Sequence, residues 1–112
     1  MVQFSRSLDT SFAALADPTR RDVLLRLARR DASISDLAGA FEMTLTGMKK
    51  HVRVLEDAGL VTTENVGRVR WCRLGPRRLD RENEWIAKYQ SMLEARYDRL
   101  GEFLERTRED HP

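Results

Sequence analysis

Apolar and polar residues recur with a helical period in the centre of the chain, between residues 45 and 58. The apolar residues are separated by three, four and three positions, which places them on one inward-facing side of a helix. They are Leu45, Met48, Val52 and Leu55. The opposite side carries hydroxyl and cationic side chains, namely Thr46, Lys49, Lys50 and Arg53. We expect Thr44 to cap this helix and Gly59 to end it.

Two short runs that favour β-structure follow this helix, at residues 60–66 and 69–74. The dipeptide Gly67-Arg68 between them suits a two-residue hairpin turn with glycine in the first position. Alternation along the second run places Arg70, Cys72 and Leu74 on one face, and Trp71 on the other. The pattern therefore predicts a two-stranded basic hairpin directly after the central helix.

Two helices are predicted in the first 30 residues. The first runs from Leu8 to Leu15, inside a helical pattern of apolar residues that begins at Phe4 and includes Phe12. The pair Asp17-Pro18 starts the second, because aspartate caps helices and proline is tolerated at their first position. This helix extends to about residue 30, and its inward residues are Val23, Leu24, Leu27 and Ala28.

A short third helix is predicted over residues 36–42, with Ser35 as its cap. Its inward residues are Leu37, Ala38 and Phe41. A brief turn then leads to the central helix, which is the spacing of a helix-turn-helix motif.

The last part of the chain predicts one long helix, from Asp80 or Asn83 to about residue 106. Its apolar stripe is wider than a single winged core can cover. The first helix likewise has more apolar residues than this core can bury. We therefore expect both helices to pair with their copies in a homodimer. The predicted interface residues are Phe4, Leu8, Phe12, Trp85, Tyr89, Met92, Leu93, Tyr97 and Leu100.

With 112 residues, the chain is expected to form a single domain. The predicted fold is mainly α with a small β-hairpin, a winged helix-turn-helix in the order α-α-α-α-β-β-α. Within it, residues 1–16 and 81–107 form the dimerisation helices, residues 35–58 the helix-turn-helix, and residues 60–74 the wing.

Net charge is only +2, but its distribution is informative. Residues 44–74 carry six lysines and arginines against three acidic residues, whereas the preceding and following segments are close to balanced. Phosphate contacts supply most sequence-independent affinity for DNA, and the major groove admits one α-helix. The central helix and hairpin thus predict double-stranded DNA as the partner. The DNA-contacting residues we expect are Thr44, Thr46, Lys49, Lys50, His51, Arg53, Arg68 and Arg70.

Simpler interpretations exist for several of these residues. The cations could form a solvated helix face, Thr44 and Thr46 could act only as caps, and His51 could be structural. The alternative for Arg70 is a side chain that points to the other face of the hairpin.

Other functional classes find little support in the sequence. No apolar run approaches the length of about 18 residues that spans a membrane, and no signal peptide is predicted. The single cysteine, Cys72, excludes an internal disulfide and fits a reducing cytoplasm. It is expected to be a small buried residue. We expect no catalytic residues, since the chain has no glycine-rich phosphate loop, Ser/His/Asp set or metal triad.

The chain resembles the ArsR family of bacterial winged-helix repressors. Four segments carry the resemblance: ALADPTRRDVLLRLA at 14–28, ISDLAGAF at 34–41, KHVRVLEDAGLV at 50–61 and GRVRWCRL at 67–74. The resemblance implies a dimeric repressor that binds a palindromic operator, in some cases in its own promoter. It implies a DNA-reading helix at 45–58 and a wing around Gly67-Arg68.

Metal sensing, common in this family, is not expected here. A Cys-x-Cys pair holds a soft metal in the third helix of some members, but residues 35–39 contain no thiol. A second family site uses Asp and His on the terminal helix, and this chain has no histidine between residues 76 and 110. We expect neither metal nor cofactor, and the effector is unknown. The alternative to a DNA-binding repressor is a winged-helix module that binds another protein.

Overall fold

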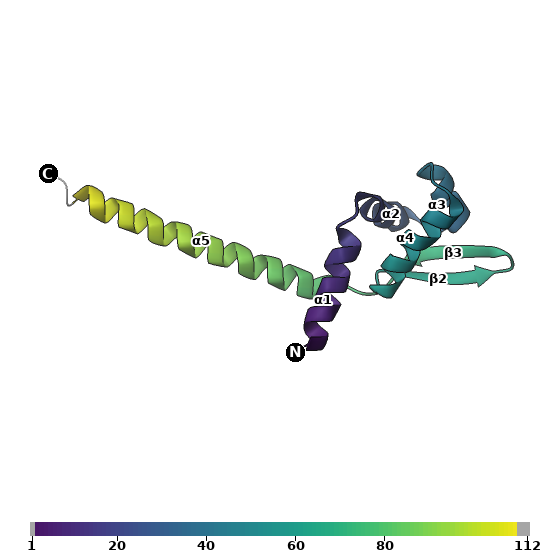
Figure 1. Ribbon diagram of the computed structural model, residues 1–112, viewed down its shortest axis with the longest axis horizontal. Helices are drawn as coiled ribbons and strands as arrows, with labels where there is room; N and C mark the ends of the chain where they lie inside the picture. Colours follow the sequence, from purple (N-terminus) through teal and green to yellow (C-terminus); the bar gives the residue numbers. More distant parts are fainter. Residues whose placement is uncertain (1, 110–112) are drawn as a thin grey trace. The chain divides into compact units, whose positions relative to one another are not determined.

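The computed structural model describes the backbone of residues 2–109 and the side chains of residues 7–108. Contacts divide the chain into two compact units, residues 1–78 and 79–112. The first unit contains four helices and three strands, and the second contains one helix (Figure 1). This order of elements confirms the predicted winged helix-turn-helix. The side chain of Phe4 lies outside the described side chains.

Helices α1 (Val2–Leu15) and α2 (Pro18–Arg29) open the first unit. Helix α1 begins six residues earlier than predicted. Helix α2 has the predicted start, where the carboxylate of Asp17 accepts a hydrogen bond from the backbone N–H of Arg20 at 3.0 Å. Of the residues predicted to face inward on α2, Val23 and Leu27 are buried, but Ala28 is exposed. Ala28 follows Leu27 directly, so it lies toward the solvent side of a helix with a narrow buried stripe.

Helix α3 (Ile34–Ala40) begins two residues earlier than the sequence predicts. The predicted cap, Ser35, is wrong: it is an exposed residue inside the helix. Ser33 is the cap, and its hydroxyl accepts a hydrogen bond from the N–H of Asp36 at 3.0 Å. The Asp36 carboxylate accepts one in return from the N–H of Ser33 at 3.5 Å. This reciprocal pair is a capping box. The predicted inward residue Phe41 lies at the C-cap and is only half-buried.

Helix α4 (Leu45–Asp57) is the predicted central helix, and Thr44 caps it by accepting a hydrogen bond from the N–H of Gly47 at 3.1 Å. Three of its four predicted inward residues are buried, namely Met48, Val52 and Leu55. The fourth, Leu45, is 44% exposed. It is the first residue of the helix and faces a surface hollow beside the wing rather than the core.

Strands β2 (Val61–Val66) and β3 (Val69–Leu74) form the predicted hairpin, and Val66 pairs with Val69 across the turn. Gly67 has a φ of 64° in this turn, a conformation that favours glycine. A third, short strand that the sequence did not predict, β1 (Ala32–Ser33), adds to β3, so the strand order is β1-β3-β2. Two isolated residues carry too little alternation to predict a strand.

The core of the first unit lies where α2, α3 and α4 pack on the inner end of the sheet. Its largest fully buried side chains include Val23, Leu37, Met48, Val52, Leu55, Val61 and Cys72. Farther out, the hairpin residues are mostly exposed, so β2 and β3 project beyond the core as a wing.

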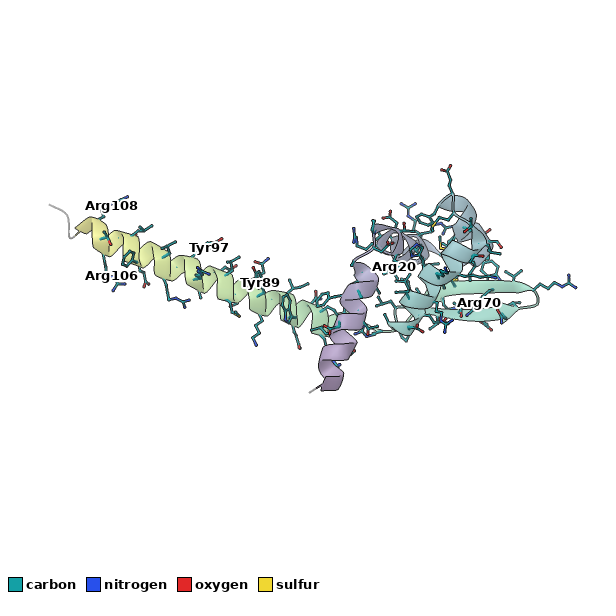
Figure 2. All side chains as sticks on the ribbon, in the orientation of Figure 1. Arg20, Arg70, Tyr89, Tyr97, Arg106 and Arg108 are labelled. Carbon is teal, nitrogen blue, oxygen red and sulfur yellow. The ribbon has the colours of Figure 1, made fainter. Side chains whose placement is uncertain are left out.

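The second unit is the helix α5 (Asp80–Glu109), which has 30 residues. It begins at one of the two predicted starts and continues three residues beyond the predicted end. Many large apolar side chains stand exposed along it, as Tyr89 and Tyr97 do in Figure 2. They are Trp85, Ile86, Tyr89, Met92, Tyr97, Leu100, Phe103 and Leu104. Within the described part of the chain, no helix has the length and apolar character to cross a membrane.

Candidate nucleic-acid interface

The outer side of α4 presents three cations to solvent. Lys49, Lys50 and Arg53 are exposed, and among the described residues no carboxylate pairs with any of them. Thr46 is exposed beside them. The buried residues Met48, Val52 and Leu55 fix the rotation of the helix, so the cations are held outward by packing. This side of α4 therefore offers unneutralised donors on a rigid element.

The wing arginines differ from one another in their surroundings. Arg68, in the turn, is exposed and has no ion pair among the described residues. Arg70 donates from Nη2 to Thr63 Oγ1 at 3.0 Å and to Glu56 Oε1 at 3.5 Å. Arg73 is paired with Glu64 and Asp31, at 3.1 and 3.7 Å. Of the three arginines on the hairpin, only Arg68 has no carboxylate partner within the described part of the chain.

Two surface hollows lie between α4 and the wing. The larger of the two, of about 480 Å³, is lined by Ile34, Lys49, Val52, Arg53, Glu56, Asp57 and Arg70. The second, of about 400 Å³, is bordered by Ser33, Ile34, Ser35, Leu45, Lys49, Asn65, Arg68, Val69 and Arg70. Lys49 and Arg70 border both. The structure thus brings together four of the predicted DNA contacts, from two elements: Lys49, Arg53, Arg68 and Arg70.

The remaining predicted contacts lie elsewhere on α4. Lys50 and Thr46 are exposed but line neither hollow, and Thr44 uses its hydroxyl oxygen as a cap acceptor. His51 is partly buried, with 21% of its side chain exposed. Its side chain is held in a polar network with Arg20 and Asp17 and does not lie on the exposed face of the helix.

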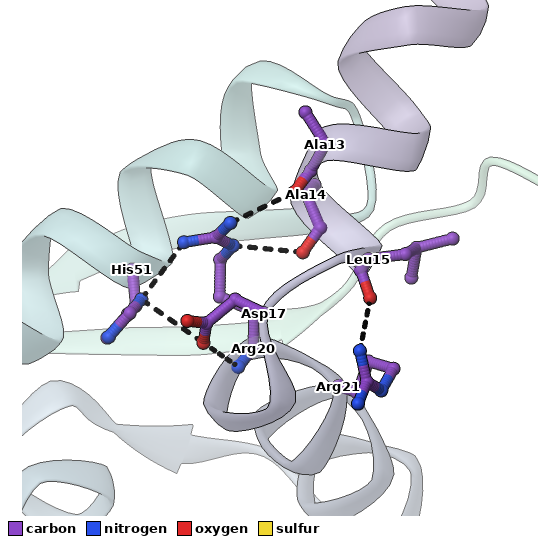
Figure 3. A network of polar contacts seen from close by, with 7 residues as sticks. All are labelled: Ala13, Ala14, Leu15, Asp17, Arg20, Arg21 and His51. Atoms are coloured by element: carbon purple, nitrogen blue, oxygen red, sulfur yellow. Dashed lines mark hydrogen bonds and ion pairs between the residues drawn. The ribbon is translucent and has the colours of Figure 1, made fainter.

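That network joins α4 to the corner between α1 and α2 (Figure 3). The Arg20 guanidinium donates to the carbonyl oxygens of Ala14 and Ala13, both at 2.9 Å. Arg20 Nη1 lies 3.3 Å from His51 Nδ1. The same ring nitrogen lies 3.9 Å from the Asp17 carboxylate. The Arg20 N–H and then the nearby His51 and Arg20 charges lower the pKa of Asp17.

Arg20 was not among the residues predicted to be important. It follows the Asp17-Pro18 helix start by two positions, within the segment DPTRR. The sequence shows a positive charge near the start of α2. It does not indicate that the Arg20 side chain would contact both α1 and α4. Such a connection depends on the packing of α1, α2 and α4.

Other reactive chemistry finds no support in the described residues. Cys72 is fully buried, and burial raises the pKa of its thiol to about 11. A thiol of this kind is a poor nucleophile because the thiolate is the reactive form. In the described part of the chain, no three His, Cys, Asp or Glu side chains are grouped so that they could hold a metal ion.

The outer face of α4 and the wing form a basic surface that suits the binding of a polyanion. Ammonium and guanidinium groups from α4 and the wing are exposed, and they suit phosphate oxygens. One helix with a buried face and a basic outer face fits a DNA major groove.

Known proteins are similar to this chain in sequence and fold. A protein-family model described as a helix-turn-helix domain matches residues 15–64. The crystal structure of an ArsR family transcriptional regulator is 42% identical, with a TM-score of 0.73 over 80% of this chain and 93% of that chain. The chain belongs to the ArsR family of transcriptional regulators.

Two curated relatives are also similar to this member of the ArsR family. The arsenical resistance operon repressor of Bacillus subtilis is 35% identical over 55% of this chain. The transcriptional repressor SmtB homolog of Synechocystis is 37% identical over 51% of this chain. The chain spans only 60% and 43% of the length of these two relatives. Both relatives are named as repressors.

Proposed function

We propose that this ArsR-family protein is a dimeric, sequence-specific repressor that binds double-stranded DNA in the cytoplasm. The observation that carries the proposal is the row of unpaired cations on α4, continued by Arg68 at the wing tip. Exposed charges without partners are available to phosphates at little cost, whereas paired ones are not. In this proposal α4 enters the major groove and the wing contacts the adjacent backbone.

The apolar surface of α5 supports the homodimer. Eight large apolar side chains are exposed on this helix, and the Trp85 and Tyr89 rings stack with centroids 5.8 Å apart. Exposed apolar surface of this extent is typical of interaction sites. A second copy would bury it and would place two α4 helices against two half-sites. Because two copies of one chain in a dimer are commonly related by a two-fold axis, the operator should be an inverted repeat. Half-sites one helical turn apart would have a centre spacing of about 34–36 Å.

A gel-shift titration on the DNA upstream of the protein's own gene tests the DNA proposal. It is run at two salt concentrations with random-sequence competitor. Competitor-resistant, salt-sensitive binding supports an autoregulating repressor. Loss of all binding to competitor means that the operator lies elsewhere or that a protein is the main partner.

Substitutions on α4 test whether its outer face contacts DNA. Lys50→Gln and Arg53→Gln should each weaken binding and reduce the slope of log K against log salt by about 0.9. Arg30→Gln, at the C-cap of α2, removes the same charge from a residue outside α4 and the hairpin and serves as control. Unchanged DNA affinity in both α4 variants would contradict the proposal that α4 contacts DNA.

The oligomeric state is tested by sedimentation. Tyr97→Glu combined with Leu100→Glu should convert a dimer to a monomer, because both exposed side chains would bring charge into the interface. Gln90→Glu adds one charge at a polar position of the same helix and should leave the dimer intact. A wild-type monomer at micromolar concentration would overturn the dimer proposal.

A further inference from the structure

Glu56 is an acidic residue within the basic surface. It lies in the last turn of α4 and accepts a hydrogen bond from Thr63 Oγ1 on β2 at 2.6 Å. The Thr63 hydroxyl in turn accepts from Arg70 Nη2 at 3.0 Å. Arg70 also reaches Glu56 Oε1 at 3.5 Å. Three elements, α4, β2 and β3, are therefore joined by one chain of polar contacts.

The strand register explains why these three side chains meet. Thr63 pairs with Cys72, and Asn65 pairs with Arg70. Alternation therefore places Thr63, Arg70 and the buried Cys72 on the face of the hairpin that α4 covers. Figure 2 shows Arg70 on the hairpin beside α4. Its guanidinium faces the reading helix and not the outer face of the wing.

The contact between Arg70 and Glu56 borders the larger of the two hollows. Arg70 and Glu56 both line it, together with the unpaired cations Lys49 and Arg53. A phosphate that enters the hollow meets these two cations, but it must compete with the Glu56 carboxylate for Arg70. The side chains of Arg70 and Glu56 are 47% and 34% exposed, and exposed ion pairs are weak. A phosphate can therefore displace the Glu56 carboxylate from Arg70 where the DNA geometry brings it close enough.

We propose that Glu56 is a specificity-determining residue that withholds Arg70 from DNA phosphates. On DNA that fits poorly, Arg70 stays with Glu56 and Thr63, and the carboxylate repels the nearest phosphate. On a site that seats α4 deeply, a phosphate displaces the carboxylate and gains Arg70 as an additional contact. The sequence-independent affinity is thereby reduced while the affinity for the correct site is retained. This inference rests on the proposed DNA binding.

The test is the binding of a random-sequence 30-base-pair duplex across a salt series, by fluorescence anisotropy. Glu56→Gln should tighten binding by about three- to five-fold at low salt. It should also steepen the slope of log K against log salt by about 0.9, the value for one additional phosphate contact. Adding Arg70→Gln to this variant should abolish both gains.

The wing offers a matched control. Glu64 pairs with Arg73 at 3.1 Å, which is also a Glu–Arg pair of the wing, but it joins β2 to β3 on the opposite face of the hairpin. Glu64→Gln makes the same change in net charge without opening the hollow. It should change affinity by less than about two-fold and leave the salt slope unchanged.

A second variant covers the case in which Glu56→Gln folds poorly. Thr63→Val keeps a β-branched residue in the strand and removes the hydroxyl that bridges Arg70 and Glu56. It should give a smaller gain in the same direction. The inference is overturned if both variants match Glu64→Gln in affinity and slope. Absence of salt-dependent binding by the wild-type protein would instead overturn the proposed DNA-binding function.

Discussion

His51 Nδ1 lies 3.3 Å from Arg20 Nη1, which connects α4 to the corner between α1 and α2. Arg20 also donates to two carbonyl oxygens at the end of α1. The last carbonyls of a helix lack the usual partner one turn further on. Arg20 provides a donor for the Ala14 carbonyl, and it adds a second donor to the Ala13 carbonyl, which also accepts from the Ala16 N–H at 3.2 Å. The network therefore fixes the orientation of α4 relative to the first two helices.

Removal of the Arg20 side-chain charge should destabilise the fold. Arg20→Gln loses the fork of bonds to Ala13 and Ala14 and leaves His51 without this neighbour. We expect the free energy of unfolding to fall by about 1–3 kcal/mol, measured by urea denaturation. Arg21→Gln is the control, because exposed Arg21 makes one bond to Leu15 at 2.8 Å. Equal losses in the two variants would contradict a special role for Arg20.

The Asp17 cap should make stability depend on acidic pH. Its hydrogen bond from the Arg20 N–H lowers the pKa of the carboxyl in the folded protein. A lowered folded pKa gives stabilisation that is complete above the unfolded pKa and is lost as the pH falls through the folded pKa. Asp17→Asn retains a good cap without titrating. Its melting temperature should therefore fall less steeply below pH 4 than that of the wild type, and identical acid profiles would exclude the effect.

Capping of α3 distinguishes two neighbouring serines. Ser33→Ala removes the hydroxyl that accepts from Asp36 and should cost about 1 kcal/mol of folding free energy. Ser35→Ala alters an exposed residue within the helix and should cost less than about 0.5 kcal/mol. Chemical denaturation of both variants measures the difference. A larger loss of folding free energy in Ser35→Ala than in Ser33→Ala would support Ser35 as the cap, as the sequence predicted.

The Cys72 thiol should be unreactive in the folded protein. It is fully buried, and burial raises its pKa to about 11. At pH 8 an aromatic disulfide reagent should label it only as fast as the protein opens, and labelling should be immediate in denaturant. Stability should also decline as the pH rises from the unfolded thiol pKa towards about 11, since the unfolded state loses its proton first. Rapid labelling without denaturant would show that the thiol is accessible.

Arg68 should contribute a contact that is independent of DNA sequence. Its place in the hairpin turn suits the DNA backbone, so Arg68→Gln should weaken binding equally on the upstream and random duplexes. The salt slope should fall by about 0.9. A loss confined to one DNA sequence would indicate that Arg68 reads bases.

Local patterns in the sequence predicted most of the elements and the surface they present. The spacing of Met48, Val52 and Leu55 determined the buried face of α4, and this placed the three lysine and arginine residues of that helix outside. Asp17, Thr44, Gly59 and Gly67 predicted helix and turn boundaries that the structure confirms. These features depend on residues close together in the chain, whose side-chain periods and backbone preferences are intrinsic.

Only the tertiary structure decided which residues far apart in sequence would meet. The pairing of Ala32 with Cys72 made a strand of two residues and moved the α3 cap to Ser33. Packing of the wing on α4 engaged Arg70 with Glu56 while Arg68 remained unpaired, although both are arginines of the same hairpin. Partner choice depends on distance and direction in space, and the period of a single segment carries neither.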